Sequence, residues 1–487
     1  MNADSSLLKR RSTFWFVALL IASLFAVTNL PWTLDDYDQA KQAFTSFEMV
    51  NGGNWLFQHT PNGKIATKPP LVGWISVLTY AGTRDWNVAW RLPSIAAALA
   101  LATVLARAAA SAYGTTAAVI AMSAFGLNLL SPRLATLVRT DMPLALVVFL
   151  IGLLIWKKIR SGDAWNSRDR LGMFALLTAS MLIKGPIVYA FLLPGILGFT
   201  WWRRGNNHAR SAWCGWWPWI ASLVVFLGWA AAGIAWVPGF YEQVVLREFA
   251  GRFSETVHRP QPLYFYFPHL IHKFAPWSVL GIALAVLGWR AMSGRFVERV
   301  RGISPDIAWL LCWSLGGLVI MSLIPSKRVD RIFPVVPPLC LLIAAGVSQL
   351  STIAPRVIRW SAAALIFACL FSGAYGAQRV VISYRSGDNG LVRFAEQVRR
   401  EAAVNGWRYG VVGGPEEGLL LYLRRTRFLK PDEAVARWNN GELDALVIPV
   451  DEAPRILEQL PGATATPLEG SITINDRIRK YVLLKRG

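Results

Sequence analysis

Residues 14–41, FWFVALLIASLFAVTNLPWTLDDYDQAK, join a long apolar run to a cluster of acids. The run approaches the length of about 20 residues that an α-helix needs to cross a bilayer. The acids Asp35, Asp36 and Asp38 follow directly, and Lys41 comes three residues later. Carboxylates and a lysine so close to a membrane surface predict chemistry at that surface as well as an anchor in the membrane.

The same apolar character continues through most of the 487 residues, of which 54% are hydrophobic. Charged residues make up 16% of the chain, whereas a soluble domain carries roughly 25%. We therefore predict a polytopic α-helical membrane protein with about eleven transmembrane helices, and a short interfacial segment near Leu71. The predicted spans are residues 13–31, 92–110, 114–132, 142–157, 171–184, 186–202, 213–236, 276–290, 306–324, 332–350 and 358–377.

The Lys and Arg residues behind the formal charge of +21 lie mostly in loops between spans, and every short loop expected on the inner side is basic. This distribution is typical of cytoplasmic loops and not of a nucleic-acid groove. We expect a cytoplasmic N-terminus, with the first apolar run kept as an uncleaved helix. An odd number of spans then places the C-terminus, together with the acidic first loop, on the outer face of the membrane.

Two domains are expected, a transmembrane domain over residues 1–378 and an extracytoplasmic α/β domain over residues 379–487. The second is richer in charge and alternates helical patterns with short apolar strands, as at Leu443–Val450. The four cysteines lie in or beside apolar spans, so no disulfide framework is expected. Gly413-Gly414 after a strand hints at a phosphate loop, but a structural turn is the favoured interpretation.

Several polar residues at span boundaries have both a functional and a structural interpretation. The acids of the first loop can bind substrate or simply cap a helix. Lys68-Pro69-Pro70 is a rigid corner whose ammonium suits a lipid phosphate, or only reaches the interface. Asp141 begins a span and is either a cap or functional, and Lys184-Gly185-Pro186 is either a phosphate contact or a charged hairpin tip.

The order of motifs resembles the ArnT-like and protein O-mannosyltransferase group of GT-C glycosyltransferases over residues 30–350. The resemblance lies in the ordered set and not in any single motif. The set comprises Asp38, Lys41, Glu48-Met49, Gly53-Asn54-Trp55, Asn62-Gly63, Lys68-Pro69-Pro70, Arg91-Leu92-Pro93-Ser94, Arg139-Thr140-Asp141-Met142-Pro143, Lys184-Gly185-Pro186, Glu248, Arg252-Phe253, His258-Arg259-Pro260, Tyr264-Phe265-Tyr266, Phe274-Ala275-Pro276-Trp277 and Pro325-Ser326-Lys327-Arg328.

The resemblance implies a site built from three loops, at about residues 32–91, 133–141 and 237–275. Such enzymes take a sugar from a polyprenyl-phosphate carrier and pass it to an acceptor hydroxyl with inversion. The expected roles are catalytic for Asp38 and Asp141, carrier-phosphate binding for Lys68, Lys184, Lys327 and Arg328, and substrate binding for Lys41, Glu48, Arg139, Arg252 and His258.

Two positions depart from the pattern of the aminoarabinose branch, whose members carry Glu before the Lys-Pro corner and Glu-His in the long loop. Those residues are metal ligands in that branch, whereas this chain has Thr67 and Phe249. We therefore expect no metal at this place and a donor sugar other than aminoarabinose. A divalent metal would need other ligands, such as His59 or His258.

We therefore predict an inverting glycosyltransferase in the bacterial inner membrane that modifies lipid A or another envelope component. Its expected partners are a polyprenyl-phosphate-linked sugar, a lipid, glycan or protein acceptor, and membrane lipids, without nucleic acid. One alternative is a transporter or flippase of lipid-linked sugars, which would normally carry ionisable residues in mid-span. Another is an inactive relative that serves as a scaffold.

Overall fold

The computed structural model describes residues 8–34, 36–204, 207–250, 260–386, 390–413, 417–474 and 477–487. The chain forms two compact units that exchange segments along the sequence. The first unit contains Met1–Thr28, Thr67–Val72 and Arg91–Ala377, and the second contains Asn29–Ala66, Gly73–Trp90 and Gln378–Gly487. The predicted first loop therefore contributes to both units.

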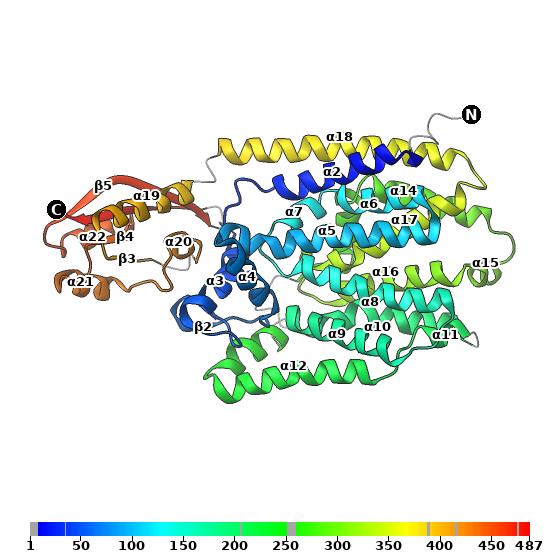
Figure 1. Ribbon diagram of the computed structural model, residues 1–487, viewed down its shortest axis with the longest axis horizontal. Helices are drawn as coiled ribbons and strands as arrows, with labels where there is room; N and C mark the ends of the chain where they lie inside the picture. Colours follow the sequence, from blue (N-terminus) through cyan, green and yellow to red (C-terminus); the bar gives the residue numbers. More distant parts are fainter. Residues whose placement is uncertain are drawn as a thin grey trace. The chain divides into compact units, whose positions relative to one another are not determined.

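The first unit is a helical bundle (Figure 1). Its helices are α2 (Arg11–Val27), α5 (Trp86–Tyr113), α6 (Thr115–Gly126), α7 (Ser131–Ala135), α8 (Asp141–Ser161), α9 (Ser167–Lys184), α10 (Ile187–Trp202), α11 (Asn207–Ser211), α12 (Trp217–Trp236), η2 (Tyr241–Ala250), η3 (Leu263–Phe265), α13 (Tyr266–Lys273), α14 (Trp277–Ala291), α15 (Phe296–Gly302), α16 (Pro305–Leu323), η4 (Val329–Val335), α17 (Val336–Leu350) and α18 (Arg356–Arg385). The first residues of α5 and the last of α18 belong to the second unit.

Each of the eleven predicted spans coincides with a helix, but the helices differ in length. Within the described part of the chain, six are long and apolar enough to cross a membrane, or seven if the bent pair Leu263–Lys273 and Trp277–Ala291 is one span. Helices α2, α6 and α10 are apolar but shorter, with 17, 12 and 16 residues. The chain is thus a multi-pass helical protein, and the count of eleven stays a prediction.

Helices α10 and α16 pack so closely that only glycine fits at their crossing. A Cβ atom at Gly195 would lie 2.8 Å from the Cα of Trp313, and one at Gly316 would lie 2.6 Å from the backbone nitrogen of Gly195. Small residues that bring backbones together are typical of helix contacts in membranes, where apolar surface alone drives no association. This contact fixes α10, which follows the Lys184-Gly185-Pro186 corner, against α16.

The second unit combines the segment after α2 with the C-terminal α/β elements. Its elements are α3 (Tyr37–Gly52), β1 (His59–Thr60), η1 (Pro61–Gly63), β2 (Lys64–Ile65), most of α4 (Leu71–Thr83), α19 (Gly390–Asn405), β3 (Tyr409–Val411), α20 (Glu417–Tyr422), α21 (Pro431–Asn439), β4 (Ala445–Pro449), α22 (Ala453–Leu457), β5 (Ala463–Ile474) and β6 (Arg477–Arg486). Helix α3 packs on α20, and the hydroxyl of Tyr422 accepts a hydrogen bond of 2.7 Å from the backbone N–H of Leu34.

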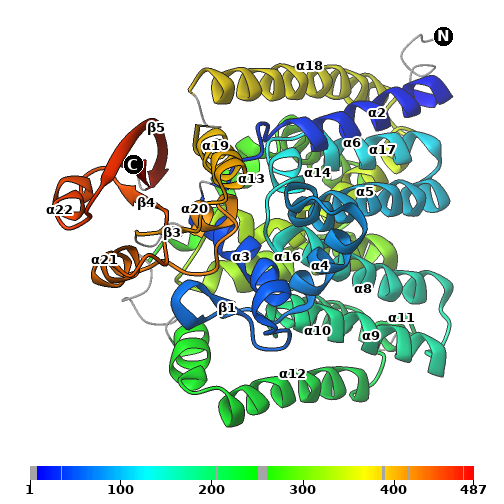
Figure 2. The same cartoon turned by 60° about the vertical axis from the view of Figure 1, so that its left-hand side comes forward.

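A four-stranded sheet in the order β3-β4-β6-β5 organises the C-terminal part, with β3 and β4 parallel and the other pairs antiparallel. Leu446 and Leu484 pair across β4 and β6 and face a core that includes Trp438 of α21. Gly470 of β5 faces the other side, where a Cβ atom would lie 2.5 Å from the ring of Phe394 in α19. Helices α21 and α19 thus cover opposite faces of the sheet (Figure 2).

Candidate active site

A cavity of about 240 Å³ in the first unit has cations at one side and apolar walls. Lys68 lines it just before the two prolines that precede α4, together with Lys184 from the end of α9 and Arg331 from η4. Its apolar lining comes from α10, α12 and the end of α16, and includes Phe191, Phe226, Trp229, Met321 and Ile324. Such a cavity suits an anion attached to an apolar chain.

Lys184 and Asp141 form the central ion pair of this region. The Lys184 Nζ lies 2.5 Å from Asp141 Oδ1, and the two side chains are only 14% and 8% exposed. Asp141 is the first residue of α8 and Lys184 the last of α9, where the helix dipoles favour a carboxylate and an ammonium respectively. Gly185, with φ +74, ends α9 in a conformation that L side chains rarely adopt. Lys68 and Arg139 are further cations that act on the Asp141 carboxylate.

A second ion pair joins Arg139 to Asp330 of η4, and Arg328 approaches the same carboxylate at 3.6 Å. The hydroxyl of Ser94 in α5 donates a hydrogen bond of 2.8 Å to the carbonyl of Leu137 and so holds the loop that carries Arg139. The sequence predicted Arg139 and Arg328 but missed Asp330, their shared partner. The structure thus brings the Asp141 loop to the segment after α16.

The remaining cations of that segment, Lys327 and Arg331, both bind backbone carbonyls. Lys327 Nζ donates to the Gln261 carbonyl at 2.9 Å, and burial lowers the pKa of this lysine. Arg331 Nη1 donates to the carbonyl and hydroxyl of Ser326 at 2.8 and 2.9 Å, and Arg331 lines the cavity. Lys327 and Arg328 are absent from the described lining of this cavity. The spacing of Arg331 is a sequence signal that could have identified it. Arg331 follows Arg328 by three residues, which is one turn of a 3₁₀-helix.

The two ion pairs leave the cluster with excess positive charge. It contains five cations, Lys68, Arg139, Lys184, Arg328 and Arg331, and two carboxylates, Asp141 and Asp330. Within this set the cations therefore outnumber the carboxylates by three. Guanidinium and ammonium groups held in place beside a partly enclosed cavity are the groups that proteins use to bind phosphate.

Asp38, Lys41 and Glu48 lie together on α3 in the second unit. The carboxylate of Asp36 caps this helix and accepts a 2.9 Å hydrogen bond from the backbone N–H of Asp38. Lys41 and Glu48 share one face because a helix turns by roughly 100° per residue, and Asp38 lies at the edge of that face. The Lys41 ammonium lies 6.0 Å from the ring centroid of Tyr37. Of the predicted loop acids, Asp38 thus belongs to a helix and Asp36 to its N-cap, whereas Asp35 lies outside the described residues.

Glu48 is buried at 7% exposure, and its carboxylate is held by an amide. Asn54 Nδ2 donates to Glu48 Oε1 at 2.5 Å, whereas the buried Oε2 has no hydrogen-bond partner in the described residues. Burial raises the pKa of Glu48, and Asn54 and His59 partly oppose this rise. Glu48, Asn54 and His59 line a cavity of about 670 Å³, which Arg427 and Lys430 of the C-terminal part also line.

Two predicted substrate-binding residues, Arg252 and His258, lie outside the described residues. Phe249 falls in η2, and Thr67 lines the cavity beside Lys68. A threonine hydroxyl is not among the usual protein ligands of zinc, so Thr67 does not restore the glutamate of the aminoarabinose branch. The described residues contain no group of three or more His, Cys, Asp or Glu side chains arranged to hold a metal ion.

The chain is similar in sequence to curated bacterial enzymes named undecaprenyl phosphate-α-4-amino-4-deoxy-L-arabinose arabinosyl transferase. It is 24% identical over 312 residues to that of Shewanella sediminis, covering 64% of this chain and 55% of the relative. It is 26% identical over 344 residues to that of Yersinia enterocolitica, covering 67% and 58%. The chain therefore matches less than two thirds of the length of these relatives. No protein-family model matches the chain.

Solved structures share the fold over nearly the whole chain. ArnT from Cupriavidus metallidurans, bound to undecaprenyl phosphate, has a TM-score of 0.70 and 19% identity over 97% of each chain. The archaeal oligosaccharyltransferase AglB from Archaeoglobus fulgidus has a TM-score of 0.53 and 11% identity, covering 90% of this chain and 70% of that one. The predicted resemblance to ArnT-like GT-C glycosyltransferases is therefore confirmed.

Proposed function

We propose that this protein is an inverting glycosyltransferase that moves a sugar from a polyprenyl-phosphate carrier to an acceptor hydroxyl on the outer face of the membrane. The observation that carries the proposal is the cavity that places Lys68, Lys184 and Arg331 beside apolar walls. A carrier lipid needs these two surfaces, cations for its phosphate and apolar side chains for its prenyl chain. The shared fold with ArnT, whose structure holds undecaprenyl phosphate, supports the same conclusion.

The cations stabilise the leaving group. When the acceptor oxygen bonds to the anomeric carbon, the bond from that carbon to the phosphate oxygen breaks and its electron pair goes to the phosphate. Lys68, Lys184 and Arg331 are fixed where this negative charge develops, and preorganised charges of this kind lower the barrier without reorganising. Lys327 and Arg328 do not contact the phosphate in this proposal, because Lys327 donates to the Gln261 carbonyl and Arg328 lies beside the Asp330 carboxylate.

Asp38 is the proposed base that takes the proton of the acceptor hydroxyl, a role that typically contributes 10²–10⁴-fold. We assign Asp141 to positioning, in place of the catalytic role expected from the sequence. Its carboxylate binds the Lys184 ammonium at 2.5 Å and so fixes the cation that meets the phosphate. Attack opposite the phosphate inverts the anomeric centre, and no covalent enzyme intermediate is needed. We derive no step through a metal.

The outer-face location rests on the distribution of basic residues. Lys157, Lys158 and Arg160 end α8 and Arg203 follows α10, whereas Asp141 and Lys184 lie at the other ends of α8 and α9. Basic loops favour the cytoplasm, which leaves the Lys68 cavity on the outer side. The acceptor is proposed to be an envelope lipid, glycan or protein, and the donor a sugar other than aminoarabinose because of Thr67 and Phe249.

The proposal is tested by transfer from defined donors. The purified chain in nanodiscs is given undecaprenyl phosphate linked to aminoarabinose, to a hexose or to a pentose, with bacterial envelope lipids as acceptors. Released undecaprenyl phosphate is measured by mass spectrometry. We expect release from at least one donor and a loss of about a hundredfold or more in Asp38→Asn.

Asp36→Asn is the matched control, because asparagine also caps a helix and this residue lies two positions away on the same element. It should retain activity. Absence of release from every carrier-linked sugar would overturn the proposed reaction. Full activity of a folded Asp38→Asn protein would overturn the assignment of the base.

A further inference from the structure

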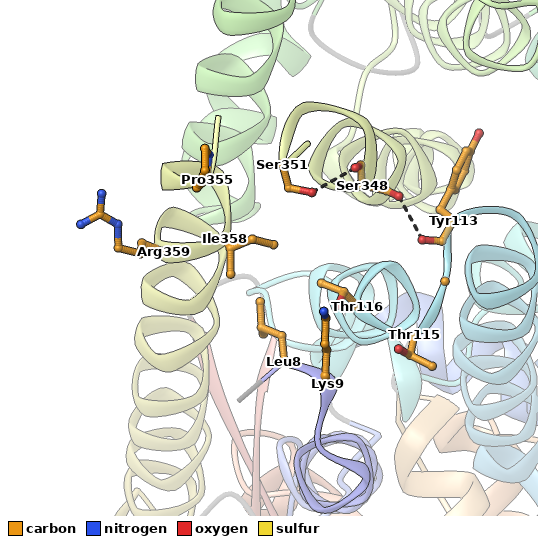
Figure 3. Close-up of a pocket in the computed structure, with 11 residues that line it drawn as sticks. Leu8, Lys9, Tyr113, Thr115, Thr116, Ser348, Ser351, Pro355, Ile358 and Arg359 are labelled. Atoms are coloured by element: carbon orange, nitrogen blue, oxygen red, sulfur yellow. Dashed lines mark hydrogen bonds between the residues drawn. The ribbon is translucent and has the colours of Figure 1, made fainter. Parts of the chain in front are cut away.

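Another cavity of the first unit, of about 420 Å³, is shown in Figure 3. It is lined by Leu8 and Lys9 ahead of α2, the junction of α5 and α6, the end of α17 and the start of α18. Helix α5 approaches the Asp141 loop at Ser94 and ends at this cavity with Tyr113. Arg160 near the end of α8 lies over the Tyr113 ring, whereas Asp141 begins the same helix.

The lining of this cavity offers positive charge and hydrogen-bond donors. Lys9 and Arg359 line it, and neither forms an ion pair within the described part of the chain. Figure 3 shows Lys9 extending into the cavity, whereas Arg359 extends outward at its edge. Thr115 and Thr116 add two hydroxyls, and no carboxylate is present among the described lining residues. Among the described lining residues the only charged side chains are therefore the two cations, Lys9 and Arg359.

The first turn of α6 adds backbone donors to the same lining. The N-cap residue is Gly114, so no side chain satisfies the first N–H groups of this 12-residue helix. Unsatisfied N–H groups and the helix dipole attract anions, phosphate in particular. The Tyr113 carbonyl at the end of α5 also lies at this cavity, and it accepts a hydrogen bond of 3.0 Å from Ser348 Oγ. Tyr113 Oη likewise binds Asp306, at 2.6 Å.

Two helices lead from this cavity along the apolar surface of the unit. Helices α2 and α18 both begin at it and run side by side (Figure 1), and Gly376 of α18 faces Leu24 of α2. Phe16 and Leu19 on α2 are 61% and 70% exposed, and Phe367 on α18 is 53% exposed. Exposed apolar side chains beside a cationic cavity provide a place for acyl chains next to a place for a headgroup.

We propose that this cavity, between Lys9, the first turn of α6 and Arg359, binds the phosphate headgroup of an anionic glycerophospholipid. The site is separate from the carrier site, since α8, with 21 residues, runs between them and spans about 30 Å at 1.5 Å per residue. That length matches the hydrocarbon core of a bilayer. The two cavities thus face the headgroups of opposite leaflets, and the proposal does not depend on the transfer reaction.

The test is competition for a fluorescent phosphatidylglycerol, followed by anisotropy with the detergent-solubilised full chain at constant ionic strength. Unlabelled phosphatidylglycerol should displace the probe, and phosphatidylcholine should do so far less well. Sodium phosphate at millimolar concentration should leave the probe bound, because it lacks acyl chains. The double variant Lys9→Ala/Arg359→Ala should weaken probe binding by about tenfold or more, since each basic residue near an anionic lipid contributes to affinity.

The matched control is Arg10→Ala/Arg356→Ala, which removes the same charge from the residue next to Lys9 and from α18, at positions outside the described lining. This variant should bind the probe like the wild type. Equal weakening in both double variants would show that probe binding depends only on the net charge of the protein, and it would overturn the proposed site. Displacement by sodium phosphate would overturn the lipid assignment, because it would identify an inorganic phosphate site. Both results can be obtained whether or not sugar transfer is observed.

Discussion

Asp141 and Glu48 are two buried carboxylates in different units, and their partners differ in kind. Asp141 is 8% exposed at its side chain and accepts from the Lys184 ammonium at 2.5 Å, with Lys68 as a further cation. Glu48 is 7% exposed as a residue and accepts from the Asn54 amide at 2.5 Å. Lysine side chains therefore offset the cost of burying the Asp141 charge, whereas the cost of burying a charged Glu48 is offset much less.

The difference indicates different uses for the two acids. A carboxylate paired with a buried lysine holds that lysine in place, and removal of either partner leaves the other charged and buried. A carboxylate held by a neutral amide changes its protonation state more readily, because burial disfavours the charged form. Asp141 thus belongs to a fixed electrostatic framework, while Glu48 responds to pH.

The largest effect on activity is expected from Lys68, a cation that acts on Asp141 and also lines the 240 Å³ cavity. In the proposed reaction Lys68 stabilises the leaving phosphate, so we expect kcat/KM for transfer to fall by about a hundredfold or more in Lys68→Ala. The measurement is release of carrier phosphate by the purified variant. Lys64→Ala, at an exposed position of the nearby hairpin, is the control and should stay close to the wild type. Retention of full activity in Lys68→Ala would remove this lysine from the site.

The pair itself is tested by a double-mutant cycle. Asp141→Asn leaves the Lys184 charge buried without its partner, so we expect a loss of about 3–5 kcal/mol in the free energy of unfolding. The double variant Asp141→Asn/Lys184→Met should recover most of this stability, because no isolated charge remains. It should not recover transfer, since the cation at the phosphate is also gone. Stability effects that simply add would show that the two residues do not act as a pair.

Much of the fold could be predicted because apolar runs and terminator residues are local features. Each predicted span coincides with a helix, and the Leu443–Val450 strand pattern leads to β4. Strand β5 (Ala463–Ile474) was missed because its small and polar residues lack a strand pattern, and only its pairing with β6 forms it. Helix α3 was read as a loop because its apolar positions are spread among polar ones.

The candidate site was less predictable because its contacts join residues far apart in sequence. Lys68, Asp141 and Lys184 were expected together from a resemblance, and the structure places them around one region. Asp330 and Arg331 were missed, since nothing local marks an acid as the partner of a cation 191 residues away. The same limit applies to Asp141, which looks like a helix cap in sequence and acquires its role only through Lys184.

The smallest effect concerns the pH response of Glu48. Its pKa is raised in the folded protein by burial, so the folded state binds a proton more tightly than the unfolded chain does. The stability that this proton provides is complete below the unfolded pKa of about 4.3 and is lost as pH rises through the raised value. Glu48→Gln should remove this slope above pH 4 in unfolding titrations, whereas Glu458→Gln, at an exposed position of the same unit, should keep it. An unchanged slope in Glu48→Gln would mean that Glu48 is charged in the folded protein throughout this range, which would erase its contrast with Asp141.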